Sequence, residues 1–222
     1  MVAMGEDGLL KEYIERLYGI CPNITYMDFL VDGNLSVVSK FLLERGYVAK
    51  PYYTQIVDLT RPEEELRANL RKSYKSLVNK TPIISILDDI TPLKNLHRQV
   101  RGIRRNDESW FIQQKMIWQK QAFAMIQSRF KSMTSLAPDN TITEAGALIY
   151  YNDYTSYYGV GCSVEGVGSH ALLWSAIMHA KKLGCKTFEM GEQVWGDNKE
   201  AQIAKFKRGF GGQTKVRLIL EK

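Results

Sequence analysis

Two hydrophobic periods run along the chain and predict an alternation of helices and strands. Apolar residues recurring every three or four positions predict helices at 9–18, 35–45, 60–77, 92–101, 109–120 and 170–183, with a last helix ending in FKRGFGG (206–212). Runs of aromatic and β-branched residues predict strands at 24–31, 52–59, 83–87, 121–130, 144–151, 154–162, 187–190 and 214–220. We therefore expect a fold that mixes helices and strands, α/β in the broad sense and α+β in the stricter one.

Capping residues mark where two of these helices begin. Asn34 is suited to cap the helix that Gly46 ends. Thr60 and Glu63 have the spacing of a capping box, and Pro62 suits the first turn of the same helix.

The segment 157–212 carries the clearest indication of function. A strand is followed by a turn with Gly166 and Gly168, and Ser169 is suited to cap the helix that Gly184 ends. The N–H groups at a helix start carry partial positive charge, and glycine lets a phosphate approach them closely. The segment therefore predicts a phosphate site, with an ordinary strand-to-helix turn as the alternative.

The distribution of charge points the same way. The formal net charge is +6. The excess gathers in three clusters: Arg67, Arg71, Lys72, Lys75 and Lys80; Lys94, Arg98, Arg101 and Arg105; and Lys205, Lys207, Arg208, Lys215 and Arg217. Such clusters attract the phosphates of tRNA, coenzyme A or a nucleotide-sugar, although each alone could be a solvated helix face.

Composition narrows the class of protein. The 222 residues are enough for one or two domains with a core. The apolar runs are too short to cross a bilayer and no signal peptide is evident, so we expect a cytoplasmic protein without a transmembrane segment. Three widely spaced cysteines, Cys21, Cys162 and Cys185, favour a reducing compartment. With three histidines they form no metal pattern, and no metal is expected.

The chain resembles the FemAB family, the aminoacyltransferases of peptidoglycan bridges, within the larger GNAT acyltransferase superfamily. The similarity lies in YTQIVDLTRPEEELRANLRKS (53–73), ESWFIQQKMI (108–117), HALLWSAIMHAKKLGCKTFEMG (170–191) and FKRGFGG (206–212). These segments occur in the family's order.

The resemblance implies a GNAT-like acyltransferase fold, a mixed sheet with flanking helices, over residues 60–222. Helices, an antiparallel meander over 121–162 and a β-α-β unit are the order that such a domain requires. Residues 1–59 look like the C-terminal half of a first GNAT-like domain, a partial half-domain. In the family the acceptor-binding cleft lies between two such halves.

The resemblance also implies how a donor is held. GNAT enzymes usually bind pyrophosphate with Q/R-x-x-G-x-G/A, and here Ser163 stands at the leading position. This departure favours aminoacyl-tRNA over acyl-CoA as the co-substrate, and no bound cofactor is expected. The expected donor-binding residues are Ser163, Gly166, Gly168, Ser169, His170, Phe206 and Arg208.

The family motif FK-x-x-FG identifies a candidate catalytic lysine. It falls on Phe206, Lys207, Phe210 and Gly211, and the resemblance implies that Lys207 assists the transferring acyl group. A positive charge there would stabilise the developing oxyanion. The alternative is a lysine that only adds surface charge.

Acyl transfer to an amine also needs proton acceptors and donors. Glu189 ends the strand TFEMG at the mouth of the expected cleft and is the candidate base, with Glu192 as an equivalent and a lysine ion pair as the alternative role. Tyr157 and Tyr158 face opposite ways, so one should point into the cleft. Tyr158 is the candidate proton donor, with core packing as the alternative.

We therefore expect an N-acyltransferase that moves an aminoacyl or acyl group from a phosphate-bearing donor to an amine. The acceptor would be a peptidoglycan precursor or a nucleotide-linked amino sugar, in cell-wall or polysaccharide biosynthesis. The alternatives are an acyl-CoA-dependent sugar N-acyltransferase and a non-catalytic tRNA- or polyanion-binding module. Trp195, beside Gly196, Asp197 and Asn198, is the tryptophan best suited to stack on a base or sugar.

Overall fold

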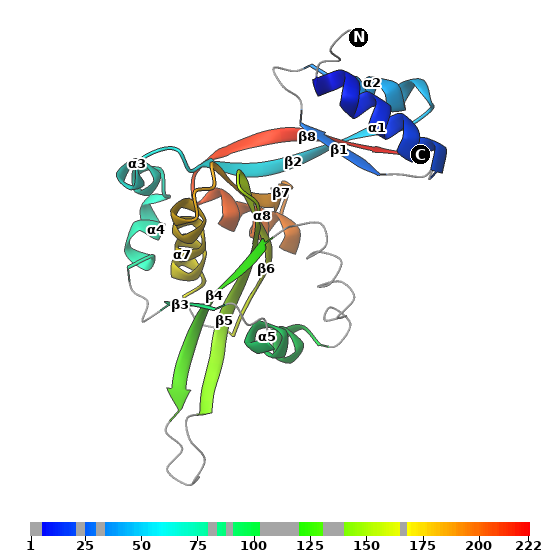
Figure 1. Cartoon of the computed structure of the whole chain (residues 1–222). Coiled ribbons are helices and arrows are strands. Elements are labelled where there is room, and N and C mark those ends of the chain that lie inside the picture. The colour runs from blue at the N-terminus through cyan, green and yellow to red at the C-terminus, as the bar shows by residue number, and fades with distance from the viewer. Residues whose placement is uncertain are drawn as a thin grey trace. The chain divides into compact units, whose positions relative to one another are not determined.

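The computed structural model describes residues 6–20, 25–29, 34–79, 84–87, 91–102, 120–130, 140–164 and 168–222. The chain forms two compact units, whose elements are labelled in Figure 1. The smaller unit comprises Met1–Thr54, Glu192–Val194 and Thr214–Lys222, and the larger comprises Gln55–Gly191 and Trp195–Gln213. The division expected between residues 59 and 60 stays a prediction.

The smaller unit packs two helices on a short sheet. Its elements are α1 (Glu6–Ile20), β1 (Tyr26–Phe29), α2 (Val37–Glu44), the first part of β2 (Val48–Asp58), and β8 (Gln213–Glu221). The strand order is β1-β8-β2, with β1 antiparallel to β8. Ile14 of α1, Phe41 and Leu42 of α2 and Leu220 of β8 are buried together, so one apolar face of each helix closes the core.

The larger unit is a mixed sheet with helices on both faces. Its elements are the end of β2, α3 (Glu63–Ala68), α4 (Lys72–Leu77), β3 (Ile84–Leu87), α5 (Thr91–Arg101), β4 (Lys120–Phe130), β5 (Asn140–Tyr151), β6 (Thr155–Ser163), α7 (Ser169–Lys182), β7 (Thr187–Glu192) and α8 (Lys199–Arg208). The strand order is β2-β7-β6-β5-β4-β3. Strands β3 to β6 pair antiparallel, whereas β6 and β7 pair parallel. The expected meander and mixed sheet with flanking helices are confirmed.

Strand β5 is buried on both of its faces. Ala147 and Ile149 belong to the core that α7 covers, and Leu148 and Tyr150 belong to the core that α5 covers. This alternation is the two-residue period of a strand. Figure 1 shows α7 and α5 on opposite sides of the β4–β6 strands.

Several predicted helix starts are wrong by a few residues. Ser36, rather than Asn34, caps α2, because its hydroxyl oxygen accepts the Ser39 N–H at 3.1 Å. Gly168 is the N-cap of α7, and Ser169 is the first helical residue. The predicted end at Gly184 is confirmed: its φ is 89°, in the left-handed region that favours glycine.

The helix predicted over 60–77 is divided into α3 and α4, with Asn69 as the C-cap of α3. The capping box is also wrong, because Pro62 is the N-cap of α3 and makes no side-chain cap. Of the helix predicted at 109–120, residues 109–119 lie outside the described residues and Lys120 begins β4. The strand predicted from residue 144 begins four residues earlier, because residues 140–143 also belong to β5.

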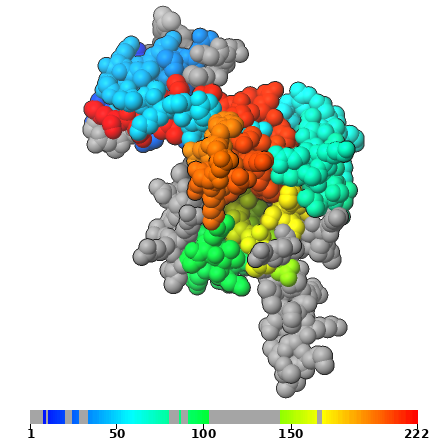
Figure 2. All heavy atoms as spheres, turned by 180° about the vertical axis from the view of Figure 1, so that it is seen from behind, coloured from blue at the N-terminus to red at the C-terminus, as the bar shows by residue number. Residues whose placement is uncertain are grey.

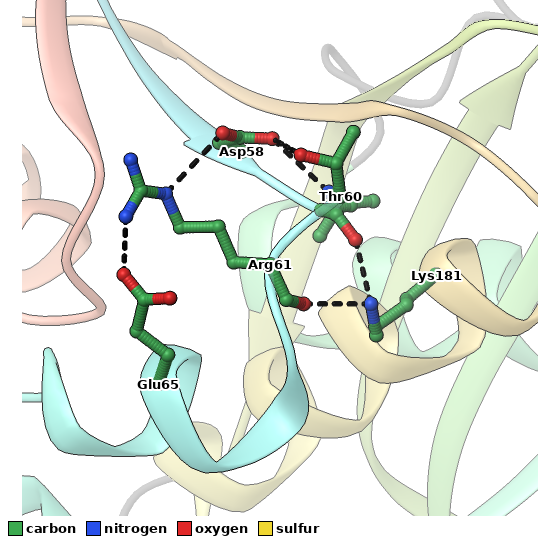
Figure 3. A network of polar contacts seen from close by, with 6 residues as sticks. Asp58, Thr60, Arg61, Glu65 and Lys181 are labelled. Atoms are coloured by element: carbon green, nitrogen blue, oxygen red, sulfur yellow. Dashed lines mark hydrogen bonds and ion pairs between the residues drawn. The ribbon is translucent and has the colours of Figure 1, made fainter.

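The turn between β2 and α3 is tied to α7 by a polar network (Figure 3). The Lys181 ammonium donates to the backbone carbonyls of Leu59 and Arg61, each at 2.7 Å. The Asp58 carboxylate accepts the Thr60 hydroxyl at 2.6 Å and the Arg61 guanidinium at 3.3 Å. The Thr60 hydroxyl lowers the pKa of Asp58, and the Arg61 charge adds to the effect.

We predict that Lys181→Met lowers the stability of the chain while Lys182→Met does not. Lys181 holds two carbonyls, whereas Lys182, the next residue of α7, is exposed. Loss of a charged donor to the partly buried Leu59 carbonyl costs about 1–3 kcal/mol, and the exposed bond to Arg61 adds little. Thermal unfolding followed by circular dichroism measures the difference, and equal midpoints for the two variants would contradict the role of the network.

Candidate active site

Strands β6 and β7 pair over a short length and then separate. The parallel register runs from Thr155 opposite Thr187 to Tyr157 opposite Glu189. Strand β6 nevertheless continues to Ser163. In the described part of these strands, the two backbones therefore diverge after Tyr157, and an irregularity opposite Leu148 and Ile149 of β5 falls at the same place.

Gly191 lies where the strands diverge. Its φ is 77°, and a Cβ built on it would lie 3.1 Å from the Tyr157 hydroxyl and 3.6 Å from the Lys207 Nζ. A hydroxyl from β6 and an ammonium from α8 thus approach the same point of β7. Only a residue without a side chain leaves this space open.

Glu189 lies two residues before Gly191 and is 3% exposed. Its neighbours Phe188 and Met190 belong to the core under α7, so alternation turns Glu189 to the other face of the sheet. Tyr157, its register partner, packs on that other face against the core of α5. Glu189 and Tyr157 therefore share one face at the point of divergence.

Tyr158 presents its ring to Lys207. The Lys207 Nζ lies 5.9 Å from the ring centroid, within the range of a cation–π contact. The Tyr158 hydroxyl lies over Gly161, where a Cβ would overlap it, and the Tyr150 ring covers Gly159 in the same way. Burial raises the pKa of Tyr158, and the Cys162 thiol adds to the rise while Arg101 opposes it.

His170, in the first turn of α7, is surrounded by aromatic rings. The ring centroids of Tyr74, Phe206 and Phe210 lie 4.3, 5.1 and 6.2 Å from that of His170. Burial lowers the pKa of His170, and the nearby charge of Arg71 lowers it further. Both effects favour the neutral form of the imidazole, which joins the aromatic cluster of the FK-x-x-FG motif to the start of α7.

The turn after α8 is fixed by backbone contacts. The Gly209 carbonyl accepts the backbone N–H of Arg71 at 2.8 Å, and the Gly211 carbonyl accepts the side-chain amide N–H of Gln55 at 2.6 Å. Gly211 and Gly212 have φ values of 84° and 80°. These values lie in the left-handed region that favours glycine, so the two residues shape a tight turn.

The start of α7 brings two more predicted residues together. The hydroxyls of Ser163, at the end of β6, and Ser169 lie 3.0 Å apart. Gly168 is partly exposed beside them. Gly166 lies outside the described residues, so its predicted part in a phosphate turn stays a prediction.

Basic side chains gather where α4 meets α8. Arg71, Lys72 and Lys75 are exposed on α4 and its N-cap, and Lys205 is exposed on α8. The Arg71 guanidinium donates to the Lys205 carbonyl at 3.1 Å, so two of the predicted basic clusters adjoin. In Figure 2 the teal surface of α3 and α4 borders the orange-red surface of α8 and the following turn.

The predicted residues thus fall into linked groups of the larger unit. Lys207, Tyr158 and Glu189 lie around the divergence of β6 and β7, and His170 and Phe206 lie in the aromatic cluster. Arg208 packs on Trp195. The exposed Glu192 belongs to the smaller unit.

Sequence reasoning did not identify the roles of Tyr74 and Gly191. Tyr74 contacts His170 across about a hundred residues, which no local period reveals. The role of Gly191 could have been predicted from the sequence, because a glycine at the end of a buried strand often marks a place where other groups approach the backbone closely.

Among the described residues, no helix combines the length and apolar character needed to cross a membrane. The same residues contain no group of three or more His, Cys, Asp or Glu side chains placed to hold a metal ion.

Comparison with solved structures identifies the architecture, whereas no family model and no curated protein matches the chain. The structure of FemX superposes with a TM-score of 0.73 at 13% identity, covering 96% of this chain and 77% of FemX. The C-terminal domain of a putative lysylphosphatidylglycerol synthetase from Agrobacterium fabrum gives 0.57 at 16% identity, covering 97% and 72%. A tandem GNAT protein from the clavulanic acid biosynthesis pathway gives 0.53 at 10% identity, covering 99% and 70%. The chain has the GNAT-type fold of these proteins, and the expected likeness to FemAB and GNAT proteins is confirmed at the level of the fold.

Proposed function

We propose that this protein is an N-acyltransferase that moves an acyl or aminoacyl group from a phosphate-bearing donor to an amine. The observation that carries the proposal is the approach of the Lys207 ammonium and the Tyr157 hydroxyl to Gly191, where β6 and β7 diverge. Acyl transfer needs a positive charge near the developing oxyanion and groups that move protons. Both kinds of group are present at this point.

Lys207 stabilises the oxyanion of the tetrahedral intermediate in this proposal. The amine nitrogen bonds to the acyl carbon, and negative charge develops on the former carbonyl oxygen. Lys207 is partly buried in the last turn of α8, between Gly191 and the Tyr158 ring. A cation held in a partly desolvated place acts more strongly than one in water.

Two further groups complete the proton transfers. Glu189 accepts the proton that the attacking amine loses, directly or through a water molecule. Tyr157 gives a proton to the leaving oxygen or sulfur as the bond between the acyl carbon and the donor breaks. Tyr157 replaces Tyr158 in this role, because the Tyr158 hydroxyl is turned to Gly161 whereas that of Tyr157 lies by Gly191.

The donor carries phosphates, and the exposed cations Arg71, Lys72, Lys75 and Lys205 support this part of the proposal. A polyanion as large as tRNA can contact all of them, whereas coenzyme A carries fewer phosphates. Ser163 bonds to Ser169 where GNAT enzymes usually have Gln or Arg, which also favours aminoacyl-tRNA. Acyl-CoA is the second candidate donor.

The acceptor is an amine of a peptidoglycan precursor or a nucleotide-linked amino sugar. The fold shared with FemX and with a putative lysylphosphatidylglycerol synthetase domain supports an acyltransferase acting on cell-wall or lipid amines. A polyanion-binding module without catalysis is the alternative. The position of Glu189 favours an enzyme, because its carboxylate shares a face with Tyr157 where β6 and β7 diverge and can accept a proton there.

We predict that Lys207→Met lowers kcat/KM by about 100- to 1000-fold, as expected for the loss of an oxyanion-stabilising group. Lys199→Met is the matched control, since it removes the same charge from an exposed position at the start of the same helix, where the proposal gives the side chain no role. Transfer from charged tRNA and from acetyl-coenzyme A to an amine measures both variants. Equal activity in the two would show that the FK motif is not catalytic here.

A second pair of variants separates the two tyrosines. Tyr157→Phe should lower kcat by about 100-fold or more through loss of a general acid. Tyr158→Phe keeps the ring beside Lys207 and should remain active. The proposal requires Tyr157→Phe to be less active than Tyr158→Phe. The reverse result would make Tyr158 the proton donor.

Salt dependence distinguishes the donors. If the donor is tRNA, its affinity should fall steeply between about 50 and 200 mM salt, because binding releases counterions from the phosphates. Arg71→Gln together with Lys75→Gln should make this dependence shallower. Tight, weakly salt-dependent binding of acetyl-coenzyme A, without tRNA binding, would instead favour acyl-CoA.

A further inference from the structure

Trp195 is an exposed indole in the larger unit, in the loop between β7 and α8. Its side chain is 58% exposed. Arg208, in the last turn of α8, places its guanidinium carbon 5.3 Å from the centre of the ring. A single exposed apolar side chain is ordinary, but an exposed indole held against a planar cation is a more specific arrangement.

The loop that carries Trp195 is fixed at its far end. The Asn198 side chain caps α8 by accepting the Ala201 N–H at 2.9 Å. Gly196, next to Trp195, has a φ of 121°, a conformation that side chains rarely adopt. Because the cap and the contact with Arg208 restrain the indole, a ligand that stacks on it loses less entropy on binding.

We propose that Trp195 and Arg208 form a stacking platform for a nucleobase of the substrate. Every nucleobase has a flat π-face, and indole and guanidinium groups both stack on such faces. Arg208 lies three residues after the exposed Lys205, so the two side chains occupy neighbouring positions on one face of α8. In this proposal, the phosphates of the molecule that carries the base bind at that cation. The inference rests on the proposed function, from which it takes the kind of ligand. It adds a subsite that binds the base of that ligand.

Three ligands contain a nucleobase and phosphates and are suitable probes: a labelled eight-residue RNA ending in CCA, UDP-N-acetylglucosamine and coenzyme A. Fluorescence anisotropy measures the RNA, and calorimetry measures the other two. Trp195→Leu should weaken at least one of them by about tenfold, the loss expected for one stacked base. The ligand that is weakened identifies the source of the base.

Matched variants test whether the effect belongs to the ring. Trp195→Phe retains an aromatic face and should restore most of the affinity. Tyr154→Leu removes another exposed aromatic ring of the larger unit, 66% exposed, and should change nothing. If RNA is the ligand, abasic sites at its three last positions should weaken the wild type but not Trp195→Leu.

The platform is ruled out if the wild type binds none of the three probes, or if Trp195→Leu binds all of them within twofold of the wild type. An equal loss in Tyr154→Leu would also rule it out. Acyl transfer is measured separately on the same samples. Binding that depends on Trp195, without acyl transfer, would contradict the proposed function but support the platform. Acyl transfer without binding that depends on Trp195 would support the proposed function but contradict the platform.

Discussion

The anchoring of the end of α8 determines where the Lys207 ammonium lies. Phe210 is 1% exposed and packs with Tyr74 and His170, and the Arg71 N–H holds the Gly209 carbonyl. A Cβ on Gly209 would overlap the Tyr74 ring, so the turn and the ring are fitted to each other. Since protein interiors are close-packed, a shift of this cluster would carry α8 with it. The FK-x-x-FG motif therefore has a structural role of its own, since Phe210 and the turn beside it fix the end of α8.

The divergence of β6 and β7 supplies the other half of the candidate site. Two strands that stay paired leave no room between them for reacting groups. Here pairing ends at Tyr157 and Glu189, and Gly191 keeps the space beyond them open. The main core continues through Phe188 and Met190 on the opposite face. The sheet can thus open at one point while the packing under α7 stays intact.

Local signals predicted much of the fold, and long-range contacts account for what they missed. The period of α7, its end at Gly184 and the meander of β4 to β6 all follow from neighbours in sequence. The break between α3 and α4 does not, because the Arg71 N–H bonds to Gly209 more than a hundred residues away. For the site, the family motif located Lys207, but the choice between the two tyrosines required the bend of β6, which no local period contains.

The two tyrosine–glycine contacts of β6 and β5 have a consequence for how the sequence can vary. The Tyr158 hydroxyl occupies the space of a Cβ at Gly161, and the Tyr150 ring occupies that of a Cβ at Gly159. A homologue with alanine at either glycine therefore has to carry a smaller or differently oriented side chain at the matching tyrosine. We therefore expect the two members of each pair to change together, and covariation at these positions would mark the irregularity of the strand in an alignment of relatives.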